Sequence, residues 1–201
     1  MGLDQFLRVN ITTTQASITY PEAQKLQKQL AKVLNTDDID FIAYAPDDPQ
    51  EAIDLDQVYD INGVPTDEYV IFSLPKTANA TYRKANQIQN FFESHFYTSD
   101  YPHGDDEYNC IATKIDDVTL HHLIHIINQV DNDPSNTKLA EKLLPTTNGF
   151  FYGGTEYGMG YYESNEQFKH DLLQLQSIRQ MVNKLLEDTE FTARLIYSSW
   201  W

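Results

Sequence analysis

The chain contains a single cysteine, Cys110, and no hydrophobic run near the roughly 20 residues that a membrane-spanning helix needs. One cysteine excludes an internal disulfide and any metal site built from several cysteines. The first residues lack the basic and apolar regions of a signal peptide, and Phe6 stands where N-myristoylation requires Ser or Thr. We therefore expect a soluble, cytoplasmic protein that does not contact a membrane.

Basic residues are also scarce, because 14 Lys and Arg face 30 Asp and Glu for a net charge of −16. Nucleic acids and anionic lipids are polyanions whose binding depends on basic side chains, so direct binding of DNA or RNA is disfavoured. A basic protein surface is the favoured partner. The 201 residues and the 41% hydrophobic content fit one globular domain, residues 1–201.

Hydrophobic periodicity predicts an α+β fold, a helix-rich single domain with a small, mostly antiparallel sheet. Strands are expected at residues 6–10, 41–45, 68–74, 110–113 and 191–198. Helices are expected at residues 21–35, 79–97, from Asp116 or Asp117 onward, at 135–144, and from a capping box formed by Ser164 and Gln167. Residues 46–68 carry prolines and many acids, which indicates loops.

The most uneven feature is an acidic stretch from Val33 to Pro75 that contains no Lys or Arg. Within it, residues 36–75 form a loop-rich segment that we interpret as an elaboration of the scaffold. A surface of this kind imitates a run of phosphates and can occupy a basic nucleic-acid site, because steering depends on the charge pattern. The alternative is that these acids form an ordinary solvent-exposed region that keeps the protein soluble. Its eleven acids are Asp37, Asp38, Asp40, Asp47, Asp48, Glu51, Asp54, Asp56, Asp60, Asp67 and Glu68.

A small-molecule pocket is a second hypothesis. Arg83, Lys84 and Asn86 lie on the expected helix 79–97 and offer cationic and amide groups for a phosphate or carboxylate. The glycine- and tyrosine-rich block 149–162, with Glu156 and Tyr157, is the expected facing wall. Alternatively, Arg83 pairs with Glu156 and the aromatic rings fill the core. No dinucleotide or P-loop fingerprint is present, so no cofactor is expected.

Metal binding and catalysis have weaker signals. Asp117, His121 and His125 share one helix face and are candidate ligands that would need a further donor such as Cys110 or His103. Histidines beside an apolar stripe are more often ordinary, partly buried side chains, and we expect no metal. Cys110 has no activating neighbour in the sequence and is expected to be buried and inert, so no catalytic residue is assigned. The terminal Trp200 and Trp201 pack on the core or form a homodimer contact.

Three parts of the chain resemble a family of small uncharacterised bacteriophage and prophage proteins. They are the start Met1-Gly2-Leu3-Asp4, the segment Tyr82-Arg83-Lys84-Ala85-Asn86-Gln87-Ile88, and the block that runs from Leu143-Leu144-Pro145-Thr146 through Gly149–Gly153 to Glu156–Glu163. The family usually has Trp, His and Trp where Tyr82, Gln89 and Phe91 stand here. The resemblance implies a phage or prophage origin and a bacterial host cytoplasm, and it carries no known activity.

The leading hypothesis is therefore a phage-encoded accessory protein, an acidic inhibitor that occupies the nucleic-acid site of a host defence protein. An enzyme or ligand-binding protein with the pocket described above is the alternative, and a virion or morphogenesis component is a third. The balance of these signals favours a binding protein over an enzyme.

Overall fold

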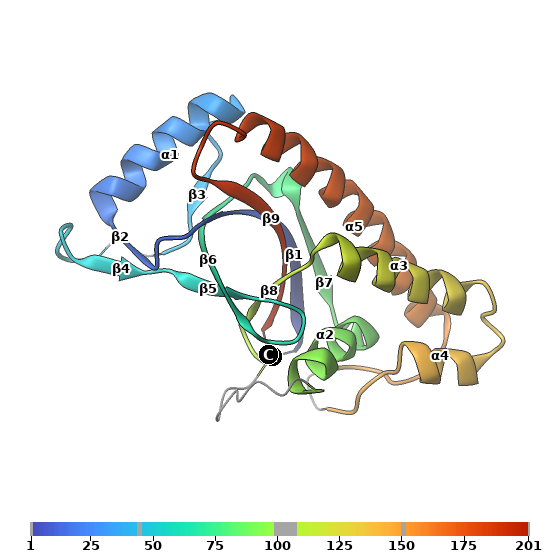
Figure 1. The fold of residues 1–201 in the computed structure, drawn as a ribbon. Coiled ribbons are helices and arrows are strands. Elements are labelled where there is room, and N and C mark those ends of the chain that lie inside the picture. The colour runs from blue at the N-terminus through green and yellow to red at the C-terminus, as the bar shows by residue number, and fades with distance from the viewer. Residues whose placement is uncertain (1, 44–45, 99–107, 150–151, 201) are drawn as a thin grey trace.

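A computed structural model describes residues 2–43, 46–98, 108–149 and 152–200 (Figure 1). It confirms an α+β fold with five helices and a mixed sheet. The strands are β1 (Asp4–Thr13), β2 (Ser17–Thr19), β3 (Asp40–Phe41), β4 (Ala52–Asp54), β5 (Asp56–Tyr59), β6 (Pro65–Ser73), β7 (Asn79–Arg83), β8 (Ala112–Lys114) and β9 (Thr192–Trp200). The helices are α1 (Tyr20–Leu34), the 3-10 turn η1 (Lys76–Ala78), α2 (Asn86–Thr98), α3 (Asp117–Asp131), α4 (Thr137–Leu143) and α5 (Met159–Leu185).

Five of the strands close into a small barrel, seen nearly end-on in Figure 1. The ring runs β1–β6–β5–β8–β9 and returns to β1, since β1 pairs with β6 as well as with β9. A closed ring with an odd number of strands cannot be antiparallel throughout, so at least one pair of neighbouring strands has to be parallel. That pair is β5–β8, and the other four pairings are antiparallel.

The long strand β1 has two different neighbours along one edge. Its first half, Asp4 to Arg8, pairs with β7, and its second half, Asn10 to Thr13, pairs with β6. β3 extends the sheet beyond β6, and β2 and β4 form a separate two-stranded ribbon. The barrel is therefore continuous with an open flap that ends at β7, and this flap leads directly into α2.

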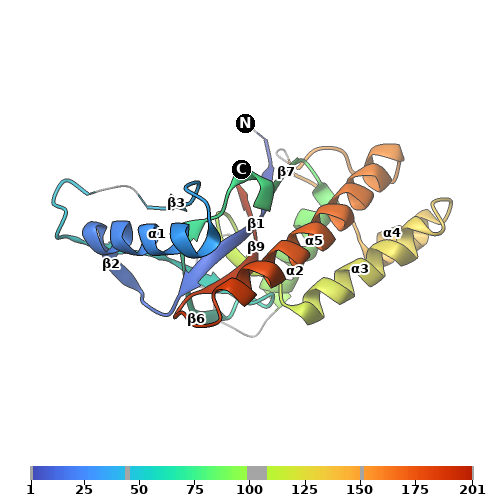
Figure 2. The same cartoon turned by 90° about the horizontal axis from the view of Figure 1, so that it is seen from above.

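The helices cover the outside of the barrel (Figures 1 and 2). α5, the longest, runs along β1 and β9 and contacts both α3 and α1. The main core lies in this layer, where Leu7 and Leu195 of the barrel wall meet the helices. In it, Tyr197 stacks on Phe92 of α2 with ring centroids 3.9 Å apart, and Phe168 of α5 lies 5.2 Å from Tyr82.

The inside of the barrel is a second, smaller core formed by Val58, Val70 and Ile196. Side chains alternate between the two faces of a strand, so Arg194 and Glu68 share this inner face. Glu68 is only 8% exposed and binds Lys114 at 3.1 Å and Arg194 through its Nε at 2.7 Å. Burial alone would raise the pKa of Glu68, but the hydrogen bonds from Arg194 and Lys114 outweigh burial and lower the pKa.

Local sequence signals place several helix ends correctly. Thr19 and Glu22 form a capping box at the start of α1, next to Pro21 in the first turn, and Asn35 closes this helix in the left-handed conformation. Asp116 caps α3 by accepting a hydrogen bond from the Thr119 backbone N–H at 2.7 Å. These interactions lie within one helical turn, so a short stretch of sequence is enough to specify them.

Several local predictions were wrong, three of them in segments that shape the barrel and α5. The helix expected at 79–97 begins only at Asn86, because residues 79–83 complete the edge of β1 as strand β7. The segment 46–68 contains β4 and β5 and the start of β6 rather than loops alone. Ser164 does not start a helix, because α5 begins at Met159 and the Ser164 hydroxyl donates to the Tyr161 carbonyl within it.

In each of these places a contact with a distant strand or loop overrides the local pattern. Ala80 and Tyr82 alternate in a way that suits a strand as well as a helix, so the free edge of β1 decides the outcome. The additional first turn of α5 is held by Tyr161, which is 5% exposed and donates from its hydroxyl to the Leu144 carbonyl at 2.7 Å. Within the described ranges, no helix combines the length and hydropathy that a bilayer crossing requires.

Candidate functional site

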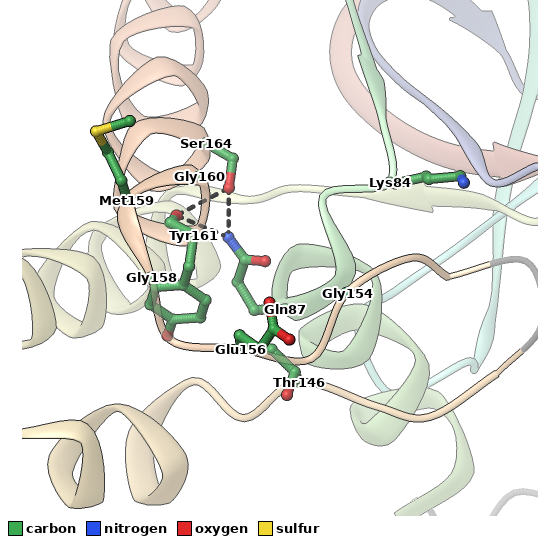
Figure 3. A pocket seen from close by; sticks show the side chains of 10 residues that line it. All are labelled: Lys84, Gln87, Thr146, Gly154, Glu156, Gly158, Met159, Gly160, Tyr161 and Ser164. Atoms are coloured by element: carbon green, nitrogen blue, oxygen red, sulfur yellow. Dashed lines mark hydrogen bonds between the residues drawn. The ribbon is translucent and has the colours of Figure 1, made fainter.

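A polar pocket of about 380 Å³ opens where α2 and α5 both begin (Figure 3). Its walls come from the turn before α2 and the first turn of that helix, from Thr146 and the segment 154–158, and from the first turn of α5. Pockets of this size hold small molecules in other proteins. The lining residues are Lys84, Gln87, Thr146, Gly154, Glu156, Gly158, Met159, Gly160, Tyr161 and Ser164.

The wall before α2 depends on a sharp change of chain direction at Lys84. Lys84 has a φ of 60°, a left-handed conformation that non-glycine residues rarely adopt. Its backbone N–H donates to the Leu3 carbonyl at 3.0 Å, and its carbonyl accepts from the Asn86 N–H at 2.8 Å. The side chain extends away from α5, so its ammonium group points out of the pocket (Figure 3).

Asn86 fixes two points of the pocket wall, Thr147 and Gly154, against the start of α2. Its amide oxygen accepts from the Thr147 backbone N–H at 2.6 Å, and its amide nitrogen donates to the carbonyls of Thr147 at 2.8 Å and Gly154 at 3.3 Å. Asn86 is 2% exposed, so these bonds exclude water and hold an otherwise irregular loop in place. Tyr157 supports the same loop by accepting a hydrogen bond from the Thr146 N–H.

Three lining glycines have no structural need to be glycine. Apart from chain neighbours and the local helix backbone, a Cβ built on Gly154, Gly158 or Gly160 meets no atom of the described residues within 4 Å, and none of the three has a positive φ. Gly153 is different, because its φ is 91° and a Cβ would lie 3.0 Å from the Lys84 side chain. All three glycines are exposed and line the pocket, so the absence of side chains there leaves its mouth open, and neither packing nor a turn requires glycine at these positions.

The first turn of α5 supplies hydrogen-bond donors and a positive potential. Gly158 is the N-cap residue, and among the described residues no side chain caps this end of the helix. The first backbone N–H groups of a helix have no intrahelical partner, and the helix dipole adds about half a positive charge there. The N–H groups of Met159 and Gly160 are thus suited to an oxygen atom that carries negative charge.

The residues predicted to form a pocket are only partly brought together. Lys84 and Glu156 line it, whereas Asn86 and Tyr157 hold its walls. Arg83 lies on β7 opposite Asp4, and no ion pair with Glu156 is found among the described residues. The prediction that Arg83 and Lys84 belong to a helix was wrong, because the helix starts after them.

The sequence analysis did not identify Gln87, Thr146 and Ser164 as lining residues, whereas Gly154, Gly158, Met159, Gly160 and Tyr161 lie in the block 149–162 that it predicted as the facing wall. Gln87 was named only within the segment that carries the resemblance, and Ser164 was interpreted as a helix cap. The resemblance contained a usable signal. All the lining residues except Gly154 and Ser164 fall within the segments that carry it, and Leu3 from the N-terminal segment binds Lys84. Segments far apart in the sequence therefore converge on one pocket.

Most acids of the acidic stretch are exposed, although β5 and β6 within it form part of the barrel, and its strand β4 lies on the side of the barrel away from α3 and α4 (Figure 1). Nine of its eleven acids are exposed, and Asp60 is half-buried because it accepts from the N–H groups of Asn62 and Val64 in a turn. Glu68 was wrongly placed on this surface, since it points into the barrel. The nine exposed acids, here called the acidic surface, are Asp37, Asp38, Asp40, Asp47, Asp48, Glu51, Asp54, Asp56 and Asp67.

Two of the three metal-ligand candidates, Asp117 and His121, make other contacts, and His125 is exposed on the same helix. Asp117 accepts from Arg179 at 2.6 Å and from Gln176 at 2.8 Å, and these bonds lower its pKa. The His121 ring nitrogen lies 2.5 Å from the Asp117 backbone oxygen. No cluster of three His, Cys, Asp or Glu suited to a metal occurs among the described residues, and His103 lies outside them.

Cys110 was expected in a buried strand but is exposed, with a left-handed φ of 63°. The strand starts two residues later, and the Cys110 N–H donates to the Ser199 carbonyl at 2.8 Å. Trp200 is half-exposed at the end of β9, opposite Asp4. Trp201 lies outside the described residues. That Trp200 and Trp201 pack on the core or form a dimer contact therefore stays a prediction.

Comparisons of the chain with protein-family models, with curated protein sequences and with solved structures find no match.

Proposed function

We propose that this protein binds a small polar ligand in the pocket at the start of α5. The observation that carries the proposal is the set of lining glycines, Gly154, Gly158 and Gly160, which keep space open without serving the fold. Two further features support it. Lys84 holds a strained conformation at the pocket wall, as residues at functional sites often do, and the first turn of α5 leaves its donors uncapped.

The proposal is that the pocket binds its ligand, and no catalytic reaction is assigned to it. The Ser164 hydroxyl in the pocket donates to the Tyr161 carbonyl at 2.8 Å and accepts from Gln87 at 2.7 Å. It is not hydrogen-bonded to a general base, which a serine nucleophile requires. Among the described lining residues, the remaining polar groups are donors and acceptors suited to recognition.

The variant Gly160→Leu tests this pocket. Leucine favours a helix over glycine by roughly 0.5 to 1 kcal/mol, and no protein atom obstructs its Cβ, so the variant should be at least as stable as wild type. Its side chain would fill the pocket. A ligand at about 100 times its dissociation constant stabilises wild type by about 2.7 kcal/mol, which corresponds to a melting-temperature rise of roughly 5 to 10 °C. That rise should be lost in the variant.

The measurement is a thermal-shift screen of small polar metabolites against wild type, Gly160→Leu and the control Ser177→Leu. Ser177 is exposed on the same helix, away from the pocket. Compounds that stabilise wild type and Ser177→Leu, but not Gly160→Leu, support the proposal. If no compound separates the variants in this way, the pocket is not the site.

The acidic surface supports a second candidate function, attachment to a basic partner such as the nucleic-acid site of a host defence protein. The observation in its favour is that no Lys or Arg lies between residues 33 and 75 and that nine of the eleven acids there are exposed. Of the eleven acids, Glu68 is the one that forms ion pairs with basic side chains among the described residues. Phage origin and an accessory role in phage–host conflict belong to this same proposal.

Reversing four of these acids, Asp47, Glu51, Asp54 and Asp56, to Lys should abolish such attachment. Their side chains are exposed and make no described side-chain hydrogen bond, so the fold should tolerate the change. The control reverses Glu141, Glu166, Glu187 and Glu190, which are exposed elsewhere and change the net charge equally. Capture from host extract should survive in the control, disappear in the test variant, and weaken steeply as salt rises. Equal capture by both variants would refute the acidic surface as the contact.

A further inference from the structure

Gln87 is a buried side chain whose orientation is fixed by three acceptors. It is 2% exposed, and its amide nitrogen donates to the Tyr161 carbonyl at 3.2 Å, to the Ser164 hydroxyl at 2.7 Å and to the Asn165 amide oxygen at 2.8 Å. A carbonyl and an amide oxygen only accept, so the nitrogen has to occupy this position. Figure 3 shows the amide oxygen directed away from Tyr161 and Ser164.

Asn165 extends this constraint to a third helix. It is fully buried, and its amide nitrogen donates to the Asp131 carboxyl at 3.0 Å, which leaves its oxygen facing Gln87. The relay runs from α3 through α5 to α2. Each amide in it has a single possible orientation, so the fold presents the Gln87 oxygen as a fixed acceptor on the pocket wall.

No donor to the Gln87 oxygen is present among the described contacts. The residue is almost wholly buried yet lines the pocket, so a molecule in the pocket, water or a ligand, can donate a hydrogen bond to this oxygen. Glu156 adds a second acceptor to the same lining, and it is charged. This part of the pocket therefore suits a group that donates hydrogen bonds and carries positive charge.

The other part of the pocket has the opposite chemistry, since Met159 and Gly160 present backbone N–H groups at the uncapped start of α5. Resting on the ligand site proposed above, we infer that the pocket selects a small zwitterion. Its protonated amine donates to the Gln87 oxygen and to Glu156. Its anionic oxygen group, a carboxylate or a phosphate, accepts from the Met159 and Gly160 N–H groups.

Matched probes test the inference on the full chain labelled with ¹⁵N. One set is β-alanine with propionate and propylamine, and the other is phosphoethanolamine with inorganic phosphate and ethanolamine. Each zwitterion should shift the Met159 and Gly160 amide signals saturably and bind about tenfold or more tightly than either half, because both ends are then paired. The two sets distinguish a carboxylate from a phosphate.

Glu156→Gln tests the amine end without disturbing the fold, whereas a change at Gln87 would break the buried relay. It should weaken the zwitterions about tenfold or more and leave propionate and phosphate unchanged, since a charge-assisted hydrogen bond is replaced by a neutral one. Glu163→Gln, an exposed change on the same segment and outside this pocket, should have no effect.

The inference and the pocket proposal fail in different ways. Zwitterions that bind no better than their halves, that ignore Glu156→Gln, or that do not bind at all overturn the inference. The pocket proposal survives these results if the metabolite screen still finds a ligand that Gly160→Leu excludes. The pocket proposal fails only if that screen finds no such ligand.

Discussion

Glu68→Gln should destabilise the protein by about 3 kcal/mol at neutral pH. Removing one partner of a buried ion pair costs about 3 to 5 kcal/mol, because the opposite charge is left without compensation. The lower end applies here, since the Lys114 and Arg194 side chains are 23% and 31% exposed and retain some water. Chemical denaturation followed by circular dichroism gives the free energy of unfolding.

The neighbouring substitution Asp67→Asn is the matched control. Asp67 precedes Glu68 on the same strand but is exposed, so its loss should change the free energy of unfolding by no more than about 0.5 kcal/mol. Equal effects of the two substitutions would contradict the placement of Glu68 inside the barrel.

The Glu68 effect should also depend on pH with a defined sign. The folded state lowers the pKa of Glu68, so its contribution to stability is present above the pKa of an unfolded glutamate and is lost as the pH falls through the folded value. Wild type and Glu68→Gln should therefore converge in stability in acid. A difference that stays constant from neutral to acidic pH would mean that Glu68 acts through its shape and not through its charge.

Phe168→Ala should be the most destabilising single change on α5, by about 3 to 5 kcal/mol, because it leaves a cavity in the layer between helix and barrel. Phe168 is fully buried, and its ring lies 5.2 Å from that of Tyr82 and 6.5 Å from that of Tyr197. It thereby holds α5 against both β7 and β9. The same denaturation experiment measures the loss.

Leu173→Ala on the same helix provides the comparison. Leu173 is 49% exposed, so little apolar surface returns to water and no internal cavity forms. Its effect should stay below about 1 kcal/mol. A cost for Phe168→Ala no larger than that of Leu173→Ala would show that α5 does not dock through this ring.

The pocket could be anticipated only in outline. Lys84 and Glu156 were identified from charge beside a glycine-rich block, and both line it. Gln87 could not be identified, since its role depends on Asn165, 78 residues away, and through it on Asp131. Arg83 was misplaced because an alternating pattern of five residues suits a strand and a helix equally, and pairing with β1 decides between them.

The sequence by itself determined the charge balance, the α+β class and the helix ends that are capped from within one turn, such as those at Thr19 and Asp116. Tertiary structure alone decided that five strands close into a barrel, that Glu68 leaves the acidic stretch to meet Arg194, 126 residues away, and that three segments enclose one pocket. The physical reason is range. A cap or an amphipathic stripe is complete within a few residues, whereas strand closure, a buried ion pair and a pocket wall exist only after distant segments have met.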